Sequence, residues 1–163
     1  MPRRTIHTPF GPLEATANDR GVTHLRFVPG TRRGDDEHPL LDTVEAWLTR
    51  YVADPRTPMD LPLAPDGTAF QHAVWNALLA IPPGQTCTYG ALARAIERPG
   101  AVRAVGRANG ANPIALLIPC HRVVASDRSL HGYAAGLDTK RRLLAHEGAL
   151  DPLFRARPDG ACF

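Results

Sequence analysis

The 163-residue sequence is poor in cysteine and contains no long apolar run. Its three cysteines, at positions 87, 120 and 162, are too scattered for a disulfide framework, and an odd number leaves at least one thiol free. No segment approaches the roughly 18 apolar residues of a membrane span, and the first residues lack the apolar stretch of a secretory signal. We therefore expect a cytoplasmic protein without membrane contact, in which a thiol is available for chemistry.

The sequence has an excess of positive charge. The formal net charge is +3, and the excess is rich in arginine and concentrated after Arg94. Such a balance indicates a polyanionic partner. A hydrophobic content of 44% suits one compact domain or a small domain fused to another.

The N-terminal part predicts an α/β domain over residues 1–65. Short alternating segments bounded by turn sequences predict an antiparallel sheet with strands at residues 5–8, 13–15 and 22–28. Apolar residues recur at helical spacing from Leu40 to Tyr51, so a helix that ends at Asp54-Pro55 should cover one face of this sheet. Residues 59–63 predict a further strand, and residues 64–67 a linker.

The part over residues 66–150 predicts a mainly helical domain, followed by a tail at 151–163 that is expected to be loosely docked or disordered. Thr68 and Gln71 form a capping-box pattern at the start of one helix. Thr88 is a candidate cap for a second helix, and a Gly-containing turn at 98–100 separates it from a third at 101–108. Two short helices joined by such a turn are typical of a helix-turn-helix. A last helix is expected at 137–145.

The run Pro119-Cys120-His121-Arg122 sets one thiol beside an imidazole and a guanidinium. Neighbouring positive charge favours the thiolate, so we expect the pKa of Cys120 to be lowered by roughly one to several units. Pro119 stops a helix and limits a strand, which predicts a sharp turn and places Cys120 at the mouth of a cleft. The alternative is a core strand over residues 114–118 that ends in a buried, inert thiol.

The helix predicted at 101–108 has little side-chain bulk, because it carries Ala104 and Gly106 beside two further alanines. Arg103 and Arg107 lie four residues apart and repel each other unless an anion is near. We interpret this helix as a surface that faces phosphate. The alternative is close packing in the core, with both arginines in solvent.

Several motifs occur together in an order that resembles one family. The chain is similar to the O6-alkylguanine-DNA alkyltransferases, densely from about Phe70 to Gly148, through Thr88-Tyr89-Gly90, Arg103-Ala104-Val105-Gly106, Asn112-Pro113, Pro119-Cys120-His121-Arg122 with two following valines, and Glu147-Gly148. The resemblance implies a ribonuclease H-like N-terminal domain and a C-terminal domain with a helix-turn-helix and an active-site loop. It further implies DNA repair by a single-turnover transfer of an alkyl group from O6 of guanine, and from O4 of thymine, to Cys120.

The resemblance also implies roles for individual residues in catalysis. Cys120 would be the nucleophile, His121 the base and Glu147 the group that orients the imidazole, with Tyr89 donating a proton to the leaving guanine. Asn112 would tie the recognition helix to the active-site loop, and Arg122 would serve structure by bridging carbonyls or a carboxylate between the two parts. An alternative for Glu147 is an ordinary surface carboxylate before a helix-ending glycine.

For DNA, the resemblance implies a slim helix in the minor groove of a duplex that carries O6-alkylguanine. Arg103 would fill the space of a flipped nucleotide. The other implied DNA contacts are Tyr89, Ala104, Gly106, Arg107 and Ser126. A monomer is expected, and the sequence leaves open whether binding along DNA is cooperative.

The substrate pocket implied by the resemblance consists of Asn109, Ala115, Val123, Tyr133, Ala134 and Ala135. Ala115 and Asn109 predict a roomier mouth, whereas Ala135 replaces a glycine usual in the family and predicts a narrower one. The cysteine ligands for zinc found in some relatives are missing, and His7, His24 and His38 do not replace them, so neither metal nor cofactor is expected.

Three other functions compete with repair. A helix-turn-helix regulator would read base edges with long polar side chains, which the helix at 101–108 lacks. A lesion sensor would bind alkylated DNA without a nucleophilic cysteine. A thiol hydrolase or redox enzyme would have no use for the slim basic helix, and no Cys-x-x-Cys is present.

Overall fold

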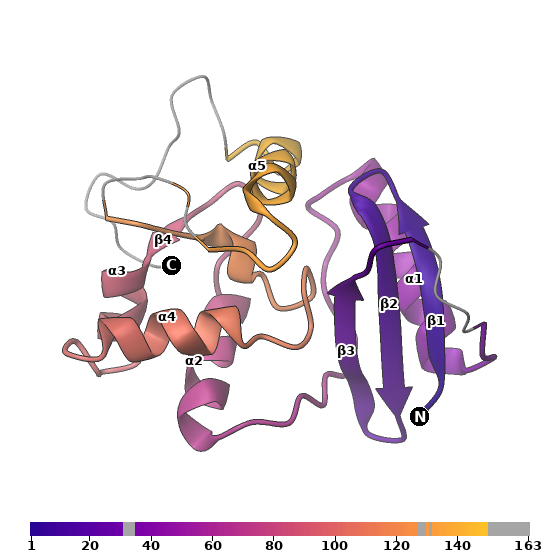
Figure 1. Ribbon diagram of the computed structural model, residues 1–163, viewed down its shortest axis with the longest axis horizontal. Helices are drawn as coiled ribbons and strands as arrows, with labels where there is room; N and C mark the ends of the chain where they lie inside the picture. The colour runs from indigo at the N-terminus through magenta and orange to yellow at the C-terminus, as the bar shows by residue number, and fades with distance from the viewer. Residues whose placement is uncertain (31–34, 127–129, 131, 150–163) are drawn as a thin grey trace. The chain divides into compact units, whose positions relative to one another are not determined.

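A computed structural model describes residues 1–30, 35–126, 130 and 132–149 of the chain (Figure 1). The chain separates into two compact units. The N-terminal unit consists of Met1–Asp66 with Pro113–Leu117, and the C-terminal unit of Gly67–Asn112 with the described residues from Ile118 onward. No helix among the described residues is both long and apolar enough to cross a membrane.

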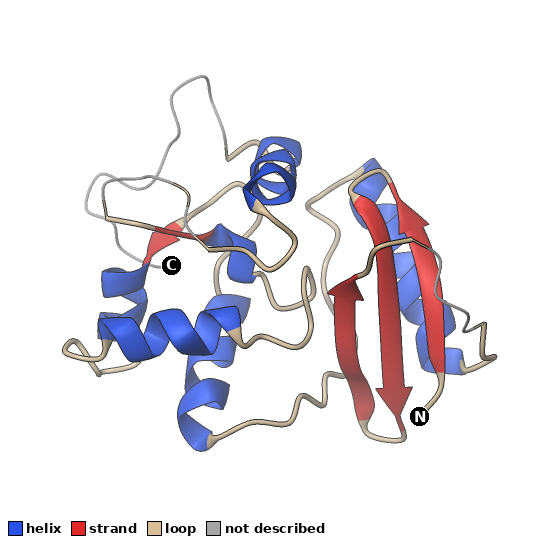
Figure 2. Ribbon diagram, viewed as in Figure 1, coloured by secondary structure: helices blue, strands red, loops and turns tan. Residues whose placement is uncertain are grey.

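The N-terminal unit is built on an antiparallel sheet, as the sequence predicted (Figure 2). Its strands are β1 (Arg3–Thr8), β2 (Gly11–Asn18) and β3 (Gly21–Phe27), in the order β1-β2-β3. The register pairs Leu13 with Phe27 and Ala15 with Leu25, so their side chains share one face of the sheet. The fold class is therefore α/β with a small antiparallel N-terminal sheet, which confirms the expectation.

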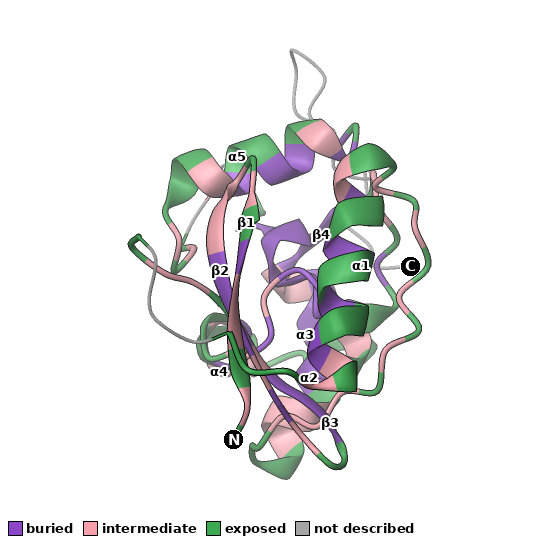
Figure 3. Cartoon of the chain, turned by 90° about the vertical axis from the view of Figure 1, so that its right-hand side faces the viewer, coloured by how far each residue is buried: buried purple, intermediate pink, exposed green. Residues whose placement is uncertain are grey.

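Helix α1 (Pro39–Ala53) covers one face of this sheet. His38 caps it, because its ring accepts a hydrogen bond from the backbone N–H of Leu40, and Pro39 occupies the first turn, where a missing N–H costs nothing. The apolar stripe of α1 is buried on the side that faces the sheet (Figure 3) and consists of Leu41, Val44, Trp47, Leu48 and Tyr51. The helix ends at Asp54, as predicted.

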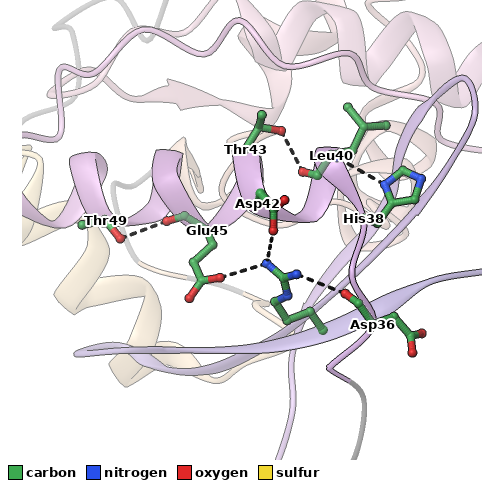
Figure 4. A network of polar contacts seen from close by, with 8 residues as sticks. Asp36, His38, Leu40, Asp42, Thr43, Glu45 and Thr49 are labelled. Atoms are coloured by element: carbon green, nitrogen blue, oxygen red, sulfur yellow. Dashed lines mark hydrogen bonds and ion pairs between the residues drawn. The ribbon is translucent and has the colours of Figure 1, made fainter.

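A polar network also joins the first strand to the start of α1 (Figure 4). The guanidinium of Arg4 donates to the carboxylates of Asp42 and Glu45, at 2.7 and 3.1 Å, and to the backbone carbonyl of Asp36 at 3.1 Å. Both carboxylates are largely exposed, so these contacts fix the orientation of the helix more than they stabilise the fold.

The strand predicted over residues 59–63 is wrong. Only Leu63 pairs there, in an isolated parallel bridge with Val22, flanked by the hydrogen bonds Val22 N–H to Pro62 O and Ala64 N–H to Val22 O, both 2.8 Å. Pro62 offers no N–H to a ladder, which prevents a regular strand. Gly21 is needed at this crossing, because a Cβ on it would lie 2.5 Å from the Pro62 carbonyl oxygen.

A five-residue excursion, Pro113–Leu117, returns to the N-terminal unit and runs beside β3. Leu25 donates to Pro113 O at 3.0 Å and accepts from Ala115 N–H at 2.8 Å. Leu116 then adopts a φ of 67°, and Leu117 N–H bonds back to Ala115 O at 2.8 Å in a γ-turn. The alternative of a core strand over 114–118 is therefore wrong, because pairing is limited to one bridge.

The C-terminal unit is mainly helical, with α2 (Ala69–Leu79), α3 (Tyr89–Ala95), α4 (Val102–Gly110) and α5 (Leu137–His146). Thr68 and Gln71 form the predicted capping box, and Thr88 caps α3 through the backbone N–H of Ala91. Helices α3 and α4 form the predicted helix-turn-helix pair. Trp75 of α2 is buried and its indole N–H donates to Ala108 O at 2.9 Å, which anchors the end of α4.

The capping box generates a test of the local fold. Thr68→Ala removes the hydroxyl that accepts from Gln71 N–H, so we expect the free energy of unfolding to fall by about 1 kcal/mol in urea denaturation. Thr49→Ala is the matched control, because its hydroxyl donates to the carbonyl of Glu45 one turn earlier, within α1, and caps no helix. Equal losses in both variants would contradict the capping role.

Candidate active site

The backbone around Cys120 turns sharply, as the sequence predicted. Pro119 has φ −81° and ψ 62°, and Cys120 N–H bonds to Ile118 O at 2.8 Å, which makes an inverse γ-turn. The 3-10 helix η1 (Cys120–Arg122) follows directly, and the chain then enters β5 (Val123–Val124). Strand β5 pairs in parallel with β4 (Cys87–Thr88), so the thiol lies at the start of a short, fixed segment.

Cys120 is a free thiol and is only 7% exposed. Two expectations are therefore wrong: the thiol does not lie at an open mouth, and its pKa is raised rather than lowered. Burial dominates because it removes the water that would solvate a thiolate. The expected charges of His121 and Arg122 do not supply the missing stabilisation, since the imidazole is neutral and the guanidinium is paired with Glu147.

Hydrogen bonds and one nearby charge oppose the effect of burial and limit the rise in the pKa of Cys120. The side chain of Asn112 hydrogen-bonds the thiol, and the backbone N–H groups of Cys120 and His121 are directed at it. Asn112 also donates from Nδ2 to Ile118 O at 2.8 Å, so one amide holds both sides of the turn. This geometry agrees with a role for Asn112 in linking the end of α4 to the active-site loop. The positive charge of Lys140 also lowers the pKa of Cys120.

His121 is completely buried, and its Nε2 lies 2.8 Å from Oε1 of Glu147. Burial lowers the pKa of His121, and the attraction of Glu147 only partly offsets this, so the ring is neutral near pH 7. A neutral ring beside a carboxylate donates from Nε2, which leaves Nδ1 as an acceptor. Nδ1 has no hydrogen-bond partner in the described part of the chain. It is therefore available to accept a proton.

Glu147 binds both His121 and Arg122. Arg122 donates from Nε to Oε2 and from Nη2 to Oε1, each at 2.9 Å, and its Nη1 donates to the carbonyl of Ile81. Burial alone would raise the pKa of Glu147. The charge that His121 gains in acid, its hydrogen bond, and the bonds and charge of Arg122 reverse the effect and hold the pKa of Glu147 well below its ordinary value. The interpretation of Glu147 as a surface carboxylate is therefore wrong.

Arg122 has the expected structural role, but not the expected partners. It bridges a carboxylate and a carbonyl that both belong to the C-terminal unit, rather than joining the two parts of the chain. Its buried, bidentate bond to Glu147 orients the carboxylate toward His121.

Tyr89 is half-buried at the first position of α3. Burial raises its pKa, and the charge of Cys120 raises it further, which places the phenol near the thiol. A Cβ on Gly106 would lie 3.9 Å from the Tyr89 ring, so the ring packs beside the small-residue side of α4. The structure thus brings Tyr89, Cys120 and α4 together.

Helix α4 has one buried side and one exposed, basic side. Val105, Ala108 and Asn109 are buried, which accounts for part of the close-packing alternative. Arg103 and Arg107 are exposed, and neither forms an ion pair with any residue that the structure describes. Ala104 and Gly106 are intermediate in burial. The exposed side of α4 therefore carries two positively charged side chains, and the residues between them have small side chains or none.

The expected pocket residues are only partly brought together. Asn109 is buried and donates from Nδ2 to Cys120 O at 3.4 Å, and Val123 is buried directly after η1. Burial raises the pKa of Tyr133 well above its ordinary value, and the charges of Cys120 and Glu147 act in the same direction, so this ring lies near both. Ala134 is exposed, Ala135 intermediate and Ser126 exposed. Residues 127–129 and 131, between Ser126 and Tyr133, lie outside the described residues.

Ala115 does not join this group, because it belongs to the Pro113–Leu117 segment of the N-terminal unit. A cavity of about 320 Å³ also occurs in the N-terminal unit, on the polar side of the sheet. It is lined by Met1, Arg3, Glu14, Thr16, His24 and Arg26, none of which the sequence singled out as a binding residue. Within the described ranges, no three or more His, Cys, Asp or Glu side chains form a metal-binding group.

Lys140 is the residue near the site that sequence reasoning missed. Its position in Lys140-Arg141-Arg142 predicted a solvated face, yet Lys140 is completely buried while the two arginines are exposed. Its ammonium group donates to Val123 O at 2.7 Å. The helical spacing indicates its burial, because Lys140 lies one turn before Leu143 and Leu144, which are buried in α5.

Comparison with known proteins matches both parts of the chain. Residues 69–149 match the family described as 6-O-methylguanine DNA methyltransferase, DNA binding domain, and residues 1–65 match its ribonuclease-like domain. A methylated-DNA–protein-cysteine methyltransferase of Methanosarcina barkeri is 44% identical over 148 residues, which cover 87% of this chain and 94% of that protein. One of Mycolicibacterium paratuberculosis is 44% identical over 155 residues, covering 91% and 93%.

Solved structures agree with the sequence matches. The crystal structure of Mycobacterium tuberculosis O6-methylguanine methyltransferase superimposes with a TM-score of 0.81 at 41% identity, covering 90% of this chain and 92% of that one. The structure of the Mycobacterium tuberculosis protein in complex with DNA gives a TM-score of 0.82 at 42% identity, covering 91% and 93%.

The paired Glu147 generates a stability prediction. Because its pKa is lower in the folded than in the unfolded chain, the carboxylate stabilises the fold above about pH 4.3, and this contribution is lost as the pH falls further. Glu147→Gln should lower the free energy of unfolding at pH 7 by about 3 kcal/mol, because Arg122 loses its buried charge partner. The same variant should lose less additional stability than the wild type between about pH 5 and pH 3.

Urea denaturation at several pH values measures both effects. Glu37→Gln, which changes an exposed carboxylate of the N-terminal unit, is the control and should behave like the wild type. Curves for Glu147→Gln that run parallel to the wild type over the acidic range would contradict the pairing.

Proposed function

Because this chain belongs to the methylated-DNA–protein-cysteine methyltransferase family, we propose that it repairs DNA by moving an alkyl group from O6 of guanine directly to Cys120. The observation that carries the proposal is the free Cys120 thiol, set beside a buried His121 and Glu147 pair whose second ring nitrogen is available. An imidazole held by a carboxylate is the arrangement that activates a thiol or hydroxyl nucleophile.

The first step is formation of the nucleophile. The thiol proton passes to Nδ1 of His121, directly or through a water, while Glu147 stabilises the resulting imidazolium through Nε2. Asn112 and the backbone N–H groups of Cys120 and His121 hydrogen-bond the sulfur and favour the anion. Arg122 keeps Glu147 ionised and oriented throughout.

The second step is displacement at the alkyl carbon. A bond forms between Sγ of Cys120 and the alkyl carbon, and the bond from that carbon to O6 of guanine breaks with its electron pair remaining on the guanine. Tyr89, whose phenol lies near the thiol and stays protonated at neutral pH because burial raises its pKa, donates a proton toward the departing base. The thioether on Cys120 has no route back to a thiol, so each molecule reacts once.

Helix α4 is the proposed DNA-binding element. Its Arg103 and Arg107 form no ion pair with any described residue, so their charges can meet phosphates, while Ala104 and Gly106 let the backbone approach the minor groove of a duplex closely. Arg103 would occupy the space of the extruded nucleotide, since an O6 substituent is out of reach inside a stacked duplex and flipping costs a few kcal/mol. Ser126 is proposed as a further phosphate contact.

The flipped base would lie against Tyr133, Val123, Ala134 and Ala135, near Asn109. Val123 directly follows η1, Asn109 donates to the backbone carbonyl of Cys120, and the charge of Cys120 raises the pKa of Tyr133. Thymine alkylated at O4 presents the same kind of alkyl–oxygen bond in a smaller ring, so it is proposed as a second substrate.

Intact-mass measurement tests the nucleophile. Reaction with a duplex that contains O6-methylguanine should add one methyl group per molecule, located on Cys120 by peptide mapping. Cys120→Ala should retain binding to the alkylated duplex and gain no mass. A methyl group on Cys87 or Cys162 would refute the assignment, and binding without any transfer would favour a lesion sensor.

Arg103→Ala tests nucleotide flipping. We expect at least a tenfold slower reaction on duplex DNA, because filling the vacated stack offsets part of a cost of a few kcal/mol, with little change on free O6-methylguanine. Arg107→Ala is the comparison variant, which should weaken binding to alkylated and undamaged duplex alike and reduce its salt dependence. An equal slowing of Arg103→Ala on duplex and free base would contradict a flipping role.

A further inference from the structure

One face of the N-terminal sheet carries a polar cavity of about 320 Å³. Its lining residues alternate along the strands with the apolar residues that face α1, so the cavity lies on the side of the sheet that α1 leaves uncovered. The register places the lining in two adjacent rows, with Arg3, Thr16 and His24 in one and Glu14 and Arg26 in the other. A cavity of this volume falls in the range of small-ligand sites.

The cavity carries two arginines without ion-pair partners among the described residues. Arg3 and Arg26 are both exposed, and the ion pairs within the described part of the chain involve other side chains. Asp36 accepts from the backbone N–H of Arg3, not from its guanidinium. The two arginines lie two strands and two residues apart, so their Cα atoms are separated by roughly 12 Å. Two arginine side chains can reach one anionic group across such a gap.

Glu14 lies on the central strand β2, between the strands of the two arginines, and is only 8% exposed. Its carboxylate forms no ion pair with Arg26, its direct neighbour on β3, or with any other described residue. A buried carboxylate is costly unless it is paired or hydrogen-bonded, and when ionised it only accepts hydrogen bonds. A ligand that suits this position therefore presents N–H donors to Glu14.

The other polar side chains of the cavity add hydrogen-bonding groups but no charge. Burial and the charge of Arg26 lower the pKa of His24, so its ring is neutral near pH 7. Glu14 and Asp66 oppose this shift without reversing it. Thr16 contributes a hydroxyl group. The lining side chains therefore carry two positive charges and one negative charge, which favours a ligand with a net negative charge.

We propose that this cavity binds a nucleotide, with its phosphate between Arg3 and Arg26 and the edge of its base on the Glu14 carboxylate. Arginine binds phosphate through parallel N–H bonds, and a carboxylate accepts from the amino groups of bases. Guanine fits best, because its ring N–H and its amino group are adjacent donors, whereas thymine places its one N–H between two carbonyl oxygens. Every lining residue belongs to the N-terminal unit, so the proposal is independent of the chemistry at Cys120.

Two ligands share this chemistry, namely a free nucleotide and an unpaired nucleotide within single-stranded DNA. Both present a phosphate and the edge of a base. An amino acid also combines an anionic group with N–H donors, but it is smaller and its zwitterion has no net charge. The net positive charge of the cavity therefore favours a nucleotide over an amino acid.

NMR of the ¹⁵N-labelled full-length protein locates the ligand. Titration with dGMP should shift the backbone amide signals of β2 and β3, with a dissociation constant below about 1 mM. The affinity for dTMP should be about tenfold lower, because its carbonyl oxygens meet the carboxylate of Glu14. A single-stranded pentanucleotide that contains one dG identifies the source. It should bind more tightly than dGMP if single-stranded DNA is the ligand, and more weakly if the free nucleotide is.

Substitutions on two strands of the cavity test the proposed contacts. Arg26→Gln should weaken the binding of dGMP and of inorganic phosphate by about tenfold or more. Arg50→Gln is the matched control and should change neither, because Arg50 is an exposed arginine of α1, which covers the opposite face of the sheet. Glu14→Gln should weaken dGMP by about tenfold yet strengthen inorganic phosphate, because it removes a charged acceptor for the base and a negative charge that repels the anion.

Three results would overturn the proposal. The first is an absence of amide shifts in β2 and β3 with dGMP at about 10 mM, with or without shifts caused by L-alanine. The second is equal affinity for dGMP and dTMP. The third is a Glu14→Gln protein in which dGMP and inorganic phosphate change in the same direction, which would indicate a disturbed sheet. Arg26→Gln keeps the test valid if Glu14→Gln does not fold, because it changes an exposed side chain.

Discussion

The buried carboxylate of Glu147 is the group on which the active site depends. It accepts from Nε2 of His121 at 2.8 Å and from two nitrogens of Arg122 at 2.9 Å, and none of these side chains has much access to water. Arg122 keeps the carboxylate ionised, and the carboxylate fixes the orientation of the imidazole. Because Arg122 also binds Ile81 O, the network ties η1, the end of α5 and the segment after α2 into one rigid group.

Burial determines how the thiol can react. A thiolate in water needs little help, but Cys120 is 7% exposed and its pKa is raised. The fold therefore has to replace solvation with fixed groups, namely the Asn112 amide, two backbone N–H groups and the ammonium of Lys140. The same burial lowers the pKa of His121, and the buried Glu147 carboxylate offsets part of that loss, so the pair keeps the imidazole neutral and oriented.

Sequence reasoning succeeded where a local rule decides the outcome. The capping box at Thr68, the cap at Thr88, the turn at Pro119 and the amphipathic α1 all follow from neighbouring residues. Errors arose where tertiary contacts decide. Arg122 was expected to favour the thiolate, but Glu147, 25 residues later, takes up its charge. Lys140 was expected in solvent because two arginines follow it, but it is buried. Residues 59–63 were expected to form a strand, but Pro62 limits their pairing to one bridge.

The tautomer of His121 is the property that tests this arrangement most directly. Nitrogen NMR of ¹⁵N-histidine-labelled protein at neutral pH distinguishes the three protonation states of an imidazole ring. A Glu147 carboxylate bound at Nε2 predicts a neutral ring with its proton on Nε2 and an unprotonated Nδ1 that has no hydrogen-bond partner among the described residues. A ring protonated on both nitrogens, or one with its single proton on Nδ1, would contradict a base prepared to accept the proton of Cys120.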